Sequence, residues 1–160
     1  MYANPQSILI TGASSGIGAA LAHHYAAPEI NLFITGRDQD RLDEVAQQCR
    51  DKGALVSVWV GDVSDTEGLK QWIYSCNDDT PLNLVIANAG VALEATTVAE
   101  LHQATQDCFR ANVDGVFNTV HPALDVMSAR RPQPVTNAQH RTLCVQKGLL
   151  GNPRHRQQSY

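Results

Sequence analysis

The chain has 160 residues, of which 43% are hydrophobic and 18% charged, and its formal net charge is −4. The length suits one domain with a buried core, and the negative charge argues against a nucleic-acid-binding protein, because phosphate contacts require an excess of Lys and Arg. No apolar run is long enough to span a bilayer, and residues 1–5 lack the basic and apolar segments of a secretion signal. We therefore expect a cytoplasmic protein without a nucleic-acid or membrane partner.

The sequence predicts no metal site. Its cysteines are Cys49, Cys76, Cys108 and Cys144, and they form no Cys-x-x-Cys pair. None of the six histidines supplies a partner at the spacing of metal ligands. Scattered cysteines in a cytoplasmic chain are typical of reduced thiols.

Strands and helices alternate from the start of the chain. Residues 7–11 are a short apolar run that predicts a buried strand, and residues 16–26 carry small and apolar residues at helical spacing. Residues 31–35 predict a second strand. Residues 40–52 predict an amphipathic helix, because their apolar positions form one stripe.

The alternation continues in the second half of the readable sequence. Residues 55–60 predict the third strand, and Ser64 or Asp65 can cap the helix that follows it. Residues 82–87 predict the fourth strand, and residues 98–127 predict a long helix with at most one break.

Four nearly continuous apolar strands joined by crossover helices predict an α/β protein with a doubly wound parallel sheet, the Rossmann fold. The strand order would reverse between the strands at 7–11 and 82–87, and a ligand is expected beyond the carboxyl ends of these strands. We divide the chain into an incomplete nucleotide-binding domain, residues 1–127, and an irregular basic tail, residues 128–160.

A glycine-rich loop, Thr11-Gly12-Ala13-Ser14-Ser15-Gly16-Ile17-Gly18, lies directly between the first strand and the first helix. Its first glycine permits a tight exit from the strand, its second lets the backbone approach a pyrophosphate, and its third lets the helix pack on the sheet. Phosphates are attracted by the N–H groups and the dipole at the start of a helix, and the two serines can add hydroxyl donors. The residues predicted to hold the phosphates are Gly12, Ser14, Ser15, Gly16, Ile17 and Gly18.

The pattern Thr-Gly-x-x-x-Gly-x-Gly at this position resembles that of the short-chain dehydrogenase/reductase family. The resemblance continues in Asp62-Val63 after the third strand, in Asn88-Ala89-Gly90 after the fourth, and in Asn112 of the long helix. It implies that Asp62 and Val63 contact adenine, that residues 88–90 line the cofactor site, and that Asn112 belongs to the catalytic set. Without the family context, Asp62 could cap a helix, Asn88 could be a turn residue, and Asn112 could be one polar residue on a helix face.

The end of the second strand bears on the choice of cofactor. An acid at this place binds the ribose 2′-hydroxyl of NAD, whereas a basic residue accommodates the 2′-phosphate of NADP. Gly36 stands where NAD-preferring relatives carry their acid, and Arg37 follows it. A guanidinium can hold a phosphate in a fork and stack on adenine. We therefore predict NADP(H) over NAD(H), with a solvated surface charge as the alternative role of Arg37.

The resemblance implies an oxidoreductase that transfers hydride between NADP(H) and an alcohol or carbonyl, and that forms a homo-oligomer when full-length. In this family a Tyr-x-x-x-Lys pair and an upstream serine carry the acid/base chemistry. Carried forward from Asn112, the family spacing places the serine, tyrosine and lysine near His140, Pro153 and Gln157, and none matches. We expect the chain to be inactive alone. The alternatives are a non-catalytic NADP(H)-binding or partner-pairing paralogue, and a frameshift product without function.

Charge is distributed unevenly along the chain. All 16 acidic residues lie at or before Asp125, whereas residues 128–160 contain six basic residues and no acid. A rise in Arg, Gln, His and Pro with total loss of acids is typical of an out-of-frame reading, and a natural truncated paralogue is the alternative. We expect no fifth strand in the tail. The sheet would then be truncated after about four strands, and residues 84–86 would lie on an exposed edge.

Overall fold

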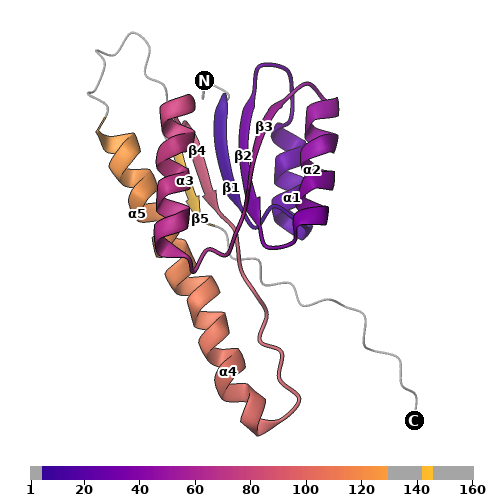
Figure 1. Cartoon of the computed structure of the whole chain (residues 1–160), viewed down its shortest axis with the longest axis vertical. Coiled ribbons are helices and arrows are strands. Elements are labelled where there is room, and N and C mark those ends of the chain that lie inside the picture. Colours follow the sequence, from indigo (N-terminus) through magenta and orange to yellow (C-terminus); the bar gives the residue numbers. More distant parts are fainter. Residues whose placement is uncertain (1–4, 130–141, 146–160) are drawn as a thin grey trace.

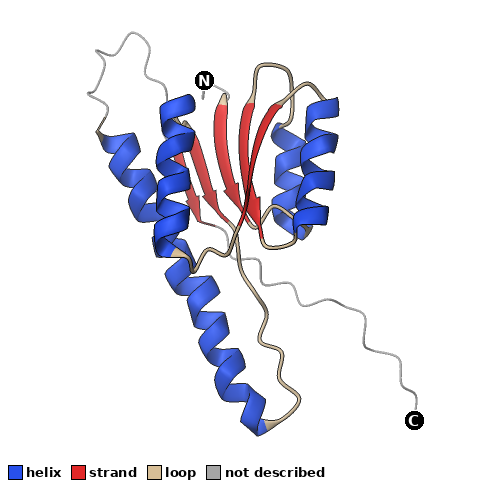
Figure 2. Cartoon of the chain, in the orientation of Figure 1, coloured by secondary structure: helices blue, strands red, loops and turns tan. Residues whose placement is uncertain are grey.

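The computed structural model describes residues 5–129 and 142–145, and here a parallel sheet lies between two layers of helices (Figures 1 and 2). The strands are β1 (Ser7–Thr11), β2 (Asn31–Gly36), β3 (Leu55–Val60), β4 (Leu84–Ala87) and β5 (Thr142–Val145). The helices are α1 (Gly16–Tyr25), α2 (Gln39–Asp51), α3 (Thr66–Asp79), α4 (Val98–Phe109) and α5 (Gly115–Ser128), with a π-helical turn, η1 (Arg110–Asp114), between the last two. The ends of the predicted elements agree with these to within two residues.

The strand order is β3-β2-β1-β4-β5, and each pair of neighbouring strands is parallel. This confirms the doubly wound sheet. The order reverses between β1 and β4, where Leu9 lies opposite Phe33 on one side and Val85 on the other. The carboxyl ends of these central strands therefore meet at one edge of the sheet, which is the place predicted for a ligand.

The tail contributes a strand, so the expectation that no fifth strand exists is wrong. β5 pairs with β4, with Leu84 opposite Thr142 and Ala87 opposite Val145. β4 is thus paired on both sides and is no edge of the sheet, and Val85 is fully buried. Thr-Leu-Cys-Val suits a strand beside a buried neighbour, but four residues are too few for a periodic pattern to reveal it. Residues 130–141 and 146–160 of the predicted tail lie outside the described residues.

Each face of the sheet has its own hydrophobic core. The helices α1 and α2 cover one face, where Ala22 and Leu42 pack against Ile8 and Ile10 of β1. The helices α3 and α5 cover the other face, where Ile73 and Ala123 pack with Leu9. Successive residues of β1 thus point into different cores, and all five of its residues are buried. This burial on both faces explains why the strand reads as an uninterrupted apolar run.

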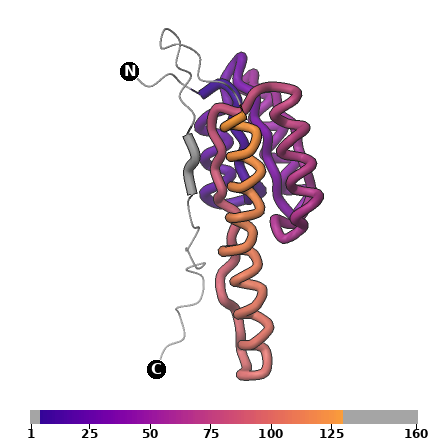
Figure 3. Tube along the Cα trace, turned by 90° about the vertical axis from the view of Figure 1, so that its left-hand side faces the viewer, coloured from indigo at the N-terminus to yellow at the C-terminus, as the bar shows by residue number. Residues whose placement is uncertain are grey.

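The predicted long helix contains one break, the turn η1. Its second part, α5, packs on α3 and β4. Its first part, α4, extends beyond the end of the sheet, as two perpendicular views show (Figures 1 and 3). None of the α4 residues is buried, and Val98 and Phe109 are 86% and 62% exposed. No helix of the described residues has the length and apolar character needed to cross a membrane.

An aromatic pair supports the strand at the β3 edge of the sheet. Trp59 of β3 stacks on Trp72 of α3, with ring centroids 5.8 Å apart. Gly61 follows directly after β3, and a side chain there would collide with the Trp59 ring. The absence of a side chain at Gly61 therefore lets the chain turn closely over the ring before it reaches Asp62.

The two-core arrangement predicts unequal effects of two leucine truncations. Leu9→Ala is expected to lower the free energy of unfolding by about 2–5 kcal/mol, because it leaves a cavity at a fully buried position. Leu55→Ala, in the edge strand at a position that is 64% exposed, is expected to change it by less than about 0.5 kcal/mol. Urea unfolding followed by circular dichroism measures both values, and equal losses would contradict this assignment of the core.

Candidate functional site

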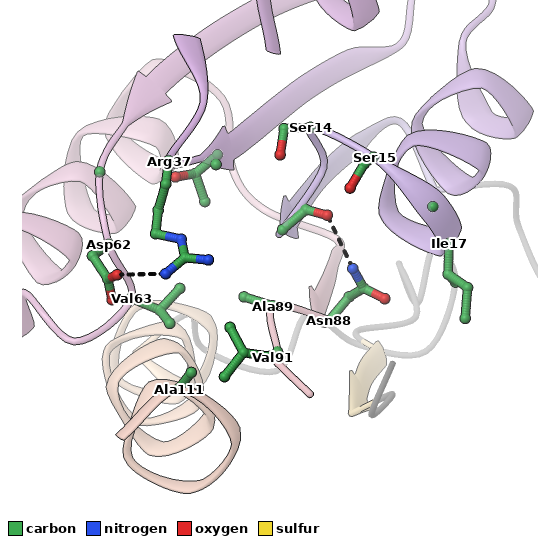
Figure 4. A pocket seen from close by; sticks show the side chains of 16 residues that line it. Ser14, Ser15, Ile17, Arg37, Asp62, Val63, Asn88, Ala89, Val91 and Ala111 are labelled. Atoms are coloured by element: carbon green, nitrogen blue, oxygen red, sulfur yellow. Dashed lines mark hydrogen bonds and ion pairs between the residues drawn. The ribbon is translucent and has the colours of Figure 1, made fainter. Parts of the chain in front are cut away.

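A cavity of about 320 Å³ lies at the carboxyl ends of the central strands (Figure 4). Its volume is within the range of small-molecule sites, roughly 300–1,000 Å³. It occupies the point where the strand order reverses. The predicted cofactor-binding residues that line it are Gly12, Ser14, Ser15, Gly16, Ile17, Arg37, Asp62, Val63, Asn88, Ala89 and Gly90. Two predicted site residues, Gly18 and Asn112, do not line it and contact residues that do.

The loop after β1 adopts a path that requires glycine at several positions. Gly12 and Gly16 have φ angles of +69° and +56°, which glycine adopts readily. A Cβ at Gly12 would lie 2.6 Å from Cα of Ala89, and a Cβ at Gly18 would collide with the Gly12 carbonyl oxygen. The loops after β1 and β4 therefore approach each other more closely than side chains permit. A Cβ at Gly16 would have nothing within 4 Å, so this glycine leaves open space in the cavity wall.

Asn88 joins these two loops. Its Nδ2 donates to the carbonyl oxygens of Thr11, at 3.1 Å, and Gly12, at 3.2 Å. Its backbone N–H donates to Oγ1 of Thr11 at 3.1 Å, and the N–H of Ala89 donates to the same oxygen. Asn88 is only 6% exposed. It therefore connects two strand ends that are far apart in the sequence, which is more than a turn residue does.

The polar groups of the cavity fit the phosphates and hydroxyl groups of a dinucleotide. Ser15 is the N-cap of α1, but its side chain makes no capping hydrogen bond. The N–H groups of the first helical turn are therefore available to an anion. Two lining residues, Thr35 and Asn88, each carry a buried side-chain oxygen without a hydrogen-bond partner, Oγ1 and Oδ1. Buried polar atoms normally have a partner, and the donors of a bound nucleotide can provide one.

Charged side chains meet at one end of the cavity. Nη1 of Arg37 lies 3.6 Å from Oδ2 of Asp62, and the guanidinium reaches from the end of β2 toward the loop after β3 (Figure 4). The other oxygen of Asp62 accepts a hydrogen bond from the Ser64 N–H at 2.8 Å. Partial burial opposes ionisation of Asp62, but the Ser64 hydrogen bonds and the charge of Arg37 outweigh it, so the pKa of Asp62 lies below its usual value. Asp62 is thus ionised at neutral pH.

The structure decides between the two candidate caps of α3. Asp65 is the N-cap, and its side chain accepts a hydrogen bond from the N–H of Gly68. The carboxylate of Asp62 instead faces Ser64 and Arg37 at the cavity. Asp62 therefore has no capping role, and the alternative that it serves only the following helix is wrong.

Asn112 acts on the cavity wall through Val91. Its Oδ1 accepts the N–H of Val91 at 2.8 Å, and its Nδ2 donates to the Val91 carbonyl oxygen at 2.9 Å. Both polar atoms of the Asn112 amide are therefore hydrogen-bonded to the backbone of Val91. Nδ2 also lies 3.1 Å from Sγ of Cys108. Asn112 lies in the π-helical turn η1, a kind of distortion that is frequent at functional sites. The side chain fixes the segment after Gly90, where a Cβ would lie 2.8 Å from Oδ1 of Asn112.

Sequence reasoning missed several residues of this site. Thr11 supplies a hydroxyl that accepts two backbone hydrogen bonds from the β4 loop. Val91 and Ala111 line the cavity. The position of Thr11, as the last strand residue before the glycine loop, is a signal that could have identified it. Nothing in the local pattern marks Val91 or Ala111, because they reach the cavity only through tertiary packing. No group of three or more potential metal ligands occurs in the described part of the chain.

Comparisons with known proteins agree with this geometry. The sequence pattern of the short chain dehydrogenase family matches residues 6–137, so the chain belongs to this family. An uncharacterized oxidoreductase of Staphylococcus saprophyticus is 30% identical over 121 residues, and the match covers 74% of this chain and 52% of the relative. A 3-dehydrosphinganine reductase of Arabidopsis thaliana is 31% identical over 123 residues, covering 76% and 37%. The chain thus spans about half the length, or less, of these curated relatives.

A solved structure shows the same fold. The alcohol dehydrogenase of the archaeon Thermococcus sibiricus, complexed with 5-hydroxy-NADP, aligns with a TM-score of 0.68 and 29% sequence identity. The alignment covers 76% of this chain and 53% of that chain. Since members of this family are oxidoreductases that bind a nicotinamide cofactor, the cavity of this chain is the candidate cofactor site.

Two glycine substitutions distinguish a tightly packed glycine from one that faces open space. Gly18→Ala is expected to lower the free energy of unfolding by about 3 kcal/mol or more, because the new Cβ collides with the Gly12 backbone, which cannot yield without moving the loop. Gly16→Ala is expected to cost only about 1 kcal/mol, from its positive φ, because its Cβ enters open space. Thermal unfolding of both variants gives the comparison. A larger loss for Gly16→Ala would contradict it.

Proposed function

We propose that this chain is the NADP(H)-binding part of a short-chain dehydrogenase/reductase that transfers hydride between NADP(H) and an alcohol or carbonyl substrate. The observation that carries this proposal is the glycine-rich loop at the start of α1, which meets the β4 loop and leaves a cavity with Arg37 at one end. Membership of the family supports it. The similarity to an alcohol dehydrogenase complexed with an NADP derivative supports it further.

Each part of the cavity then has a function. A bound dinucleotide supplies the hydride donor or acceptor. Gly16 and the N–H groups of the first turn of α1 bind the pyrophosphate, while Asp62 and Val63 bind the adenine. Ala89 and Gly90 form the wall on the β4 side, and Asn112 is a positioning residue that holds this wall through Val91.

The choice of NADP(H) rests on the end of β2. Arg37 lines the cavity with a side chain that is 66% exposed, so its guanidinium is accessible to a ligand phosphate. Gly36 offers no carboxylate for a ribose 2′-hydroxyl. Asp38, the next acid, is occupied elsewhere, because it caps α2 and pairs with Arg41 at 3.2 Å. Asp38, the acid of the turn after β2, is thus not available to pair with Arg37. The exposed guanidinium of Arg37 favours the 2′-phosphate that NADP(H) carries and NAD(H) lacks.

Arg37→Ala is the first test of this proposal. The variant is expected to lose about tenfold to a hundredfold in affinity for NADPH, because a charge-assisted contact to the 2′-phosphate disappears. Its affinity for NADH is expected to change little. Isothermal titration calorimetry with the whole chain measures both dissociation constants.

The matched control is Arg50→Ala, which removes the same charge from an exposed side chain of α2 that does not line the cavity. It is expected to leave the ratio of NADPH to NADH affinity unchanged. Tighter binding of NADH than of NADPH by the original chain, or equal effects of both substitutions, would refute the NADP(H) preference.

A second specificity test concerns the close contact between Gly36 and Ser14. A Cβ at Gly36 would lie 2.9 Å from both Cβ and Oγ of Ser14. Gly36→Asp, which supplies the acid typical of NAD sites, is therefore expected to weaken binding of both cofactors and to cost about 1–3 kcal/mol of stability. Adding Ser14→Gly removes the collision, and the double variant is expected to recover stability and to prefer NADH. Calorimetry and thermal unfolding test both claims, and an NADH-selective single variant of unchanged stability would contradict the coupling.

We also infer that the chain transfers no hydride by itself, because His140, Pro153 and Gln157 stand where the family carries serine, tyrosine and lysine. The second candidate function is therefore non-catalytic binding of NADP(H) with a partner chain. The apolar side chains of the long helical segment favour it, since they remain exposed to solvent. They are Val98, Leu101, Phe109, Phe117 and Leu124. We propose a homo-oligomer or a pair with a full-length relative through this surface.

The remaining alternative is a frameshift product without function. Binding of NADPH without turnover favours the non-catalytic candidate, whereas absence of both binding and a cooperative melting transition favours a product that does not fold. Resequencing of the coding DNA from the codon of Ala123 onward distinguishes a damaged reading frame from a natural remnant.

A further inference from the structure

The Arg37–Asp62 pair stands at the boundary between two cavities. Both residues line the cavity of about 320 Å³ described above, and both also line a second cavity of about 600 Å³ beside α4. The ion pair therefore lies within the space that a ligand of the first cavity uses. A side chain that binds the 2′-phosphate must do so while this carboxylate is next to it.

The carboxylate is the fixed member of the pair. Oδ1 of Asp62 is held by the Ser64 N–H at 2.8 Å, which leaves Oδ2 facing Arg37. The side chain of Asp62 is 41% exposed, against 66% for the longer and more flexible Arg37. Since the loop anchors only the acid, the guanidinium is the group that can move when an anion enters.

The contact itself is weak enough to be exchanged. A separation of 3.6 Å between Nη1 and Oδ2 is longer than the roughly 2.7–2.9 Å of a charge-assisted hydrogen bond. Exposed ion pairs of this kind contribute little to stability. A 2′-phosphate offers a geometry that guanidinium can bind with two parallel hydrogen bonds. The phosphate nevertheless enters beside a carboxylate that repels it and shares its cation.

Other charged groups near the pair do not replace this carboxylate. Asp38 is engaged with Arg41, and Asp107 of the second cavity pairs with Arg110 at 3.7 Å. Glu100, which also lines the second cavity, accepts hydrogen bonds from Thr96. Asp62 is therefore the acid that competes for Arg37 among the ion pairs of the described residues.

We propose that Asp62 is a specificity-determining residue, whose carboxylate competes with the 2′-phosphate of NADP(H) for Arg37 and thereby restrains the preference over NAD(H). The inference rests on the proposed function, because it requires that Arg37 binds this phosphate. It assigns to Asp62 a second effect besides any contact with adenine. A contact with adenine is the same for both cofactors and cancels in the ratio of their affinities, whereas competition for Arg37 changes the ratio.

The test is Asp62→Asn in the whole chain, with dissociation constants for NADPH and NADH from isothermal titration calorimetry. Asparagine keeps the oxygen that accepts the Ser64 N–H and removes only the charge. The ratio of NADPH to NADH affinity is expected to rise about threefold to fivefold. Adenosine 2′,5′-bisphosphate and adenosine 5′-monophosphate serve as a second pair of probes that differ only in the 2′-phosphate, and their ratio is expected to rise equally.

Asp65→Asn is the matched control. It makes the same change in charge three residues away, at a helix cap that lines neither cavity, and is expected to leave the ratio unchanged. In a chain that also carries Arg37→Ala, Asp62→Asn is expected to raise the ratio by less than it does in the original chain, because the shared cation is gone and only direct repulsion remains.

The outcomes separate the two proposals. If Arg37→Ala lowers the ratio but Asp62→Asn leaves it unchanged or lowers it, competition is refuted and the proposed role of Arg37 stands. If Asp62→Asn raises the ratio equally with and without Arg37, the carboxylate acts by repulsion alone, and competition for the cation is again refuted. If Arg37→Ala leaves the ratio unchanged, or if neither cofactor binds, the proposed function fails and this inference fails with it.

Discussion

The close approach of two loops at the centre of the sheet is the constraint on which the rest of this structure depends. The chain leaves β1 and β4 at adjacent points, and the contact between Gly12 and Ala89 leaves no space for a side chain. Asn88 makes this approach favourable, because its amide donates to the carbonyl oxygens of Thr11 and Gly12 in the β1 loop. The start of α1 follows from this arrangement, since Gly18 packs directly on the Gly12 carbonyl. The cavity is the space beside this junction.

The residues of the site differ in how much the fold depends on them. Gly12, Gly18 and Asn88 are tightly packed, and substitutions there affect folding before they affect binding. Arg37 and Asp62 lie at the periphery, are exposed, and can change with little effect on the fold. This division explains how one family fold supports different cofactor preferences, because the residues that discriminate are separate from those that hold the strands together.

The sequence was sufficient for the parts of the fold that repeat a local pattern. Apolar runs and helical stripes predicted β1 to β4 and the helices between them, and the glycine spacing predicted the cavity wall. It was insufficient where tertiary pairing decides: β5 has four residues in an irregular segment, and only its position beside β4 makes it a strand. The partner of Asp62 could not be predicted either, because Arg37 and Asp62 follow different strands, β2 and β3, and meet only where these strands pair.

The stacked tryptophans at the β3 edge give the protein an intrinsic fluorescent probe. Trp59 and Trp72 are the two tryptophans of the chain, so their emission originates from one location. The Trp59 ring touches Gly61, which lines the cavity and directly precedes Asp62. Any shift of this backbone segment alters the polarity around the rings and therefore the wavelength of the emitted light. A ligand that displaces this segment of the cavity wall therefore changes the intrinsic fluorescence of the protein.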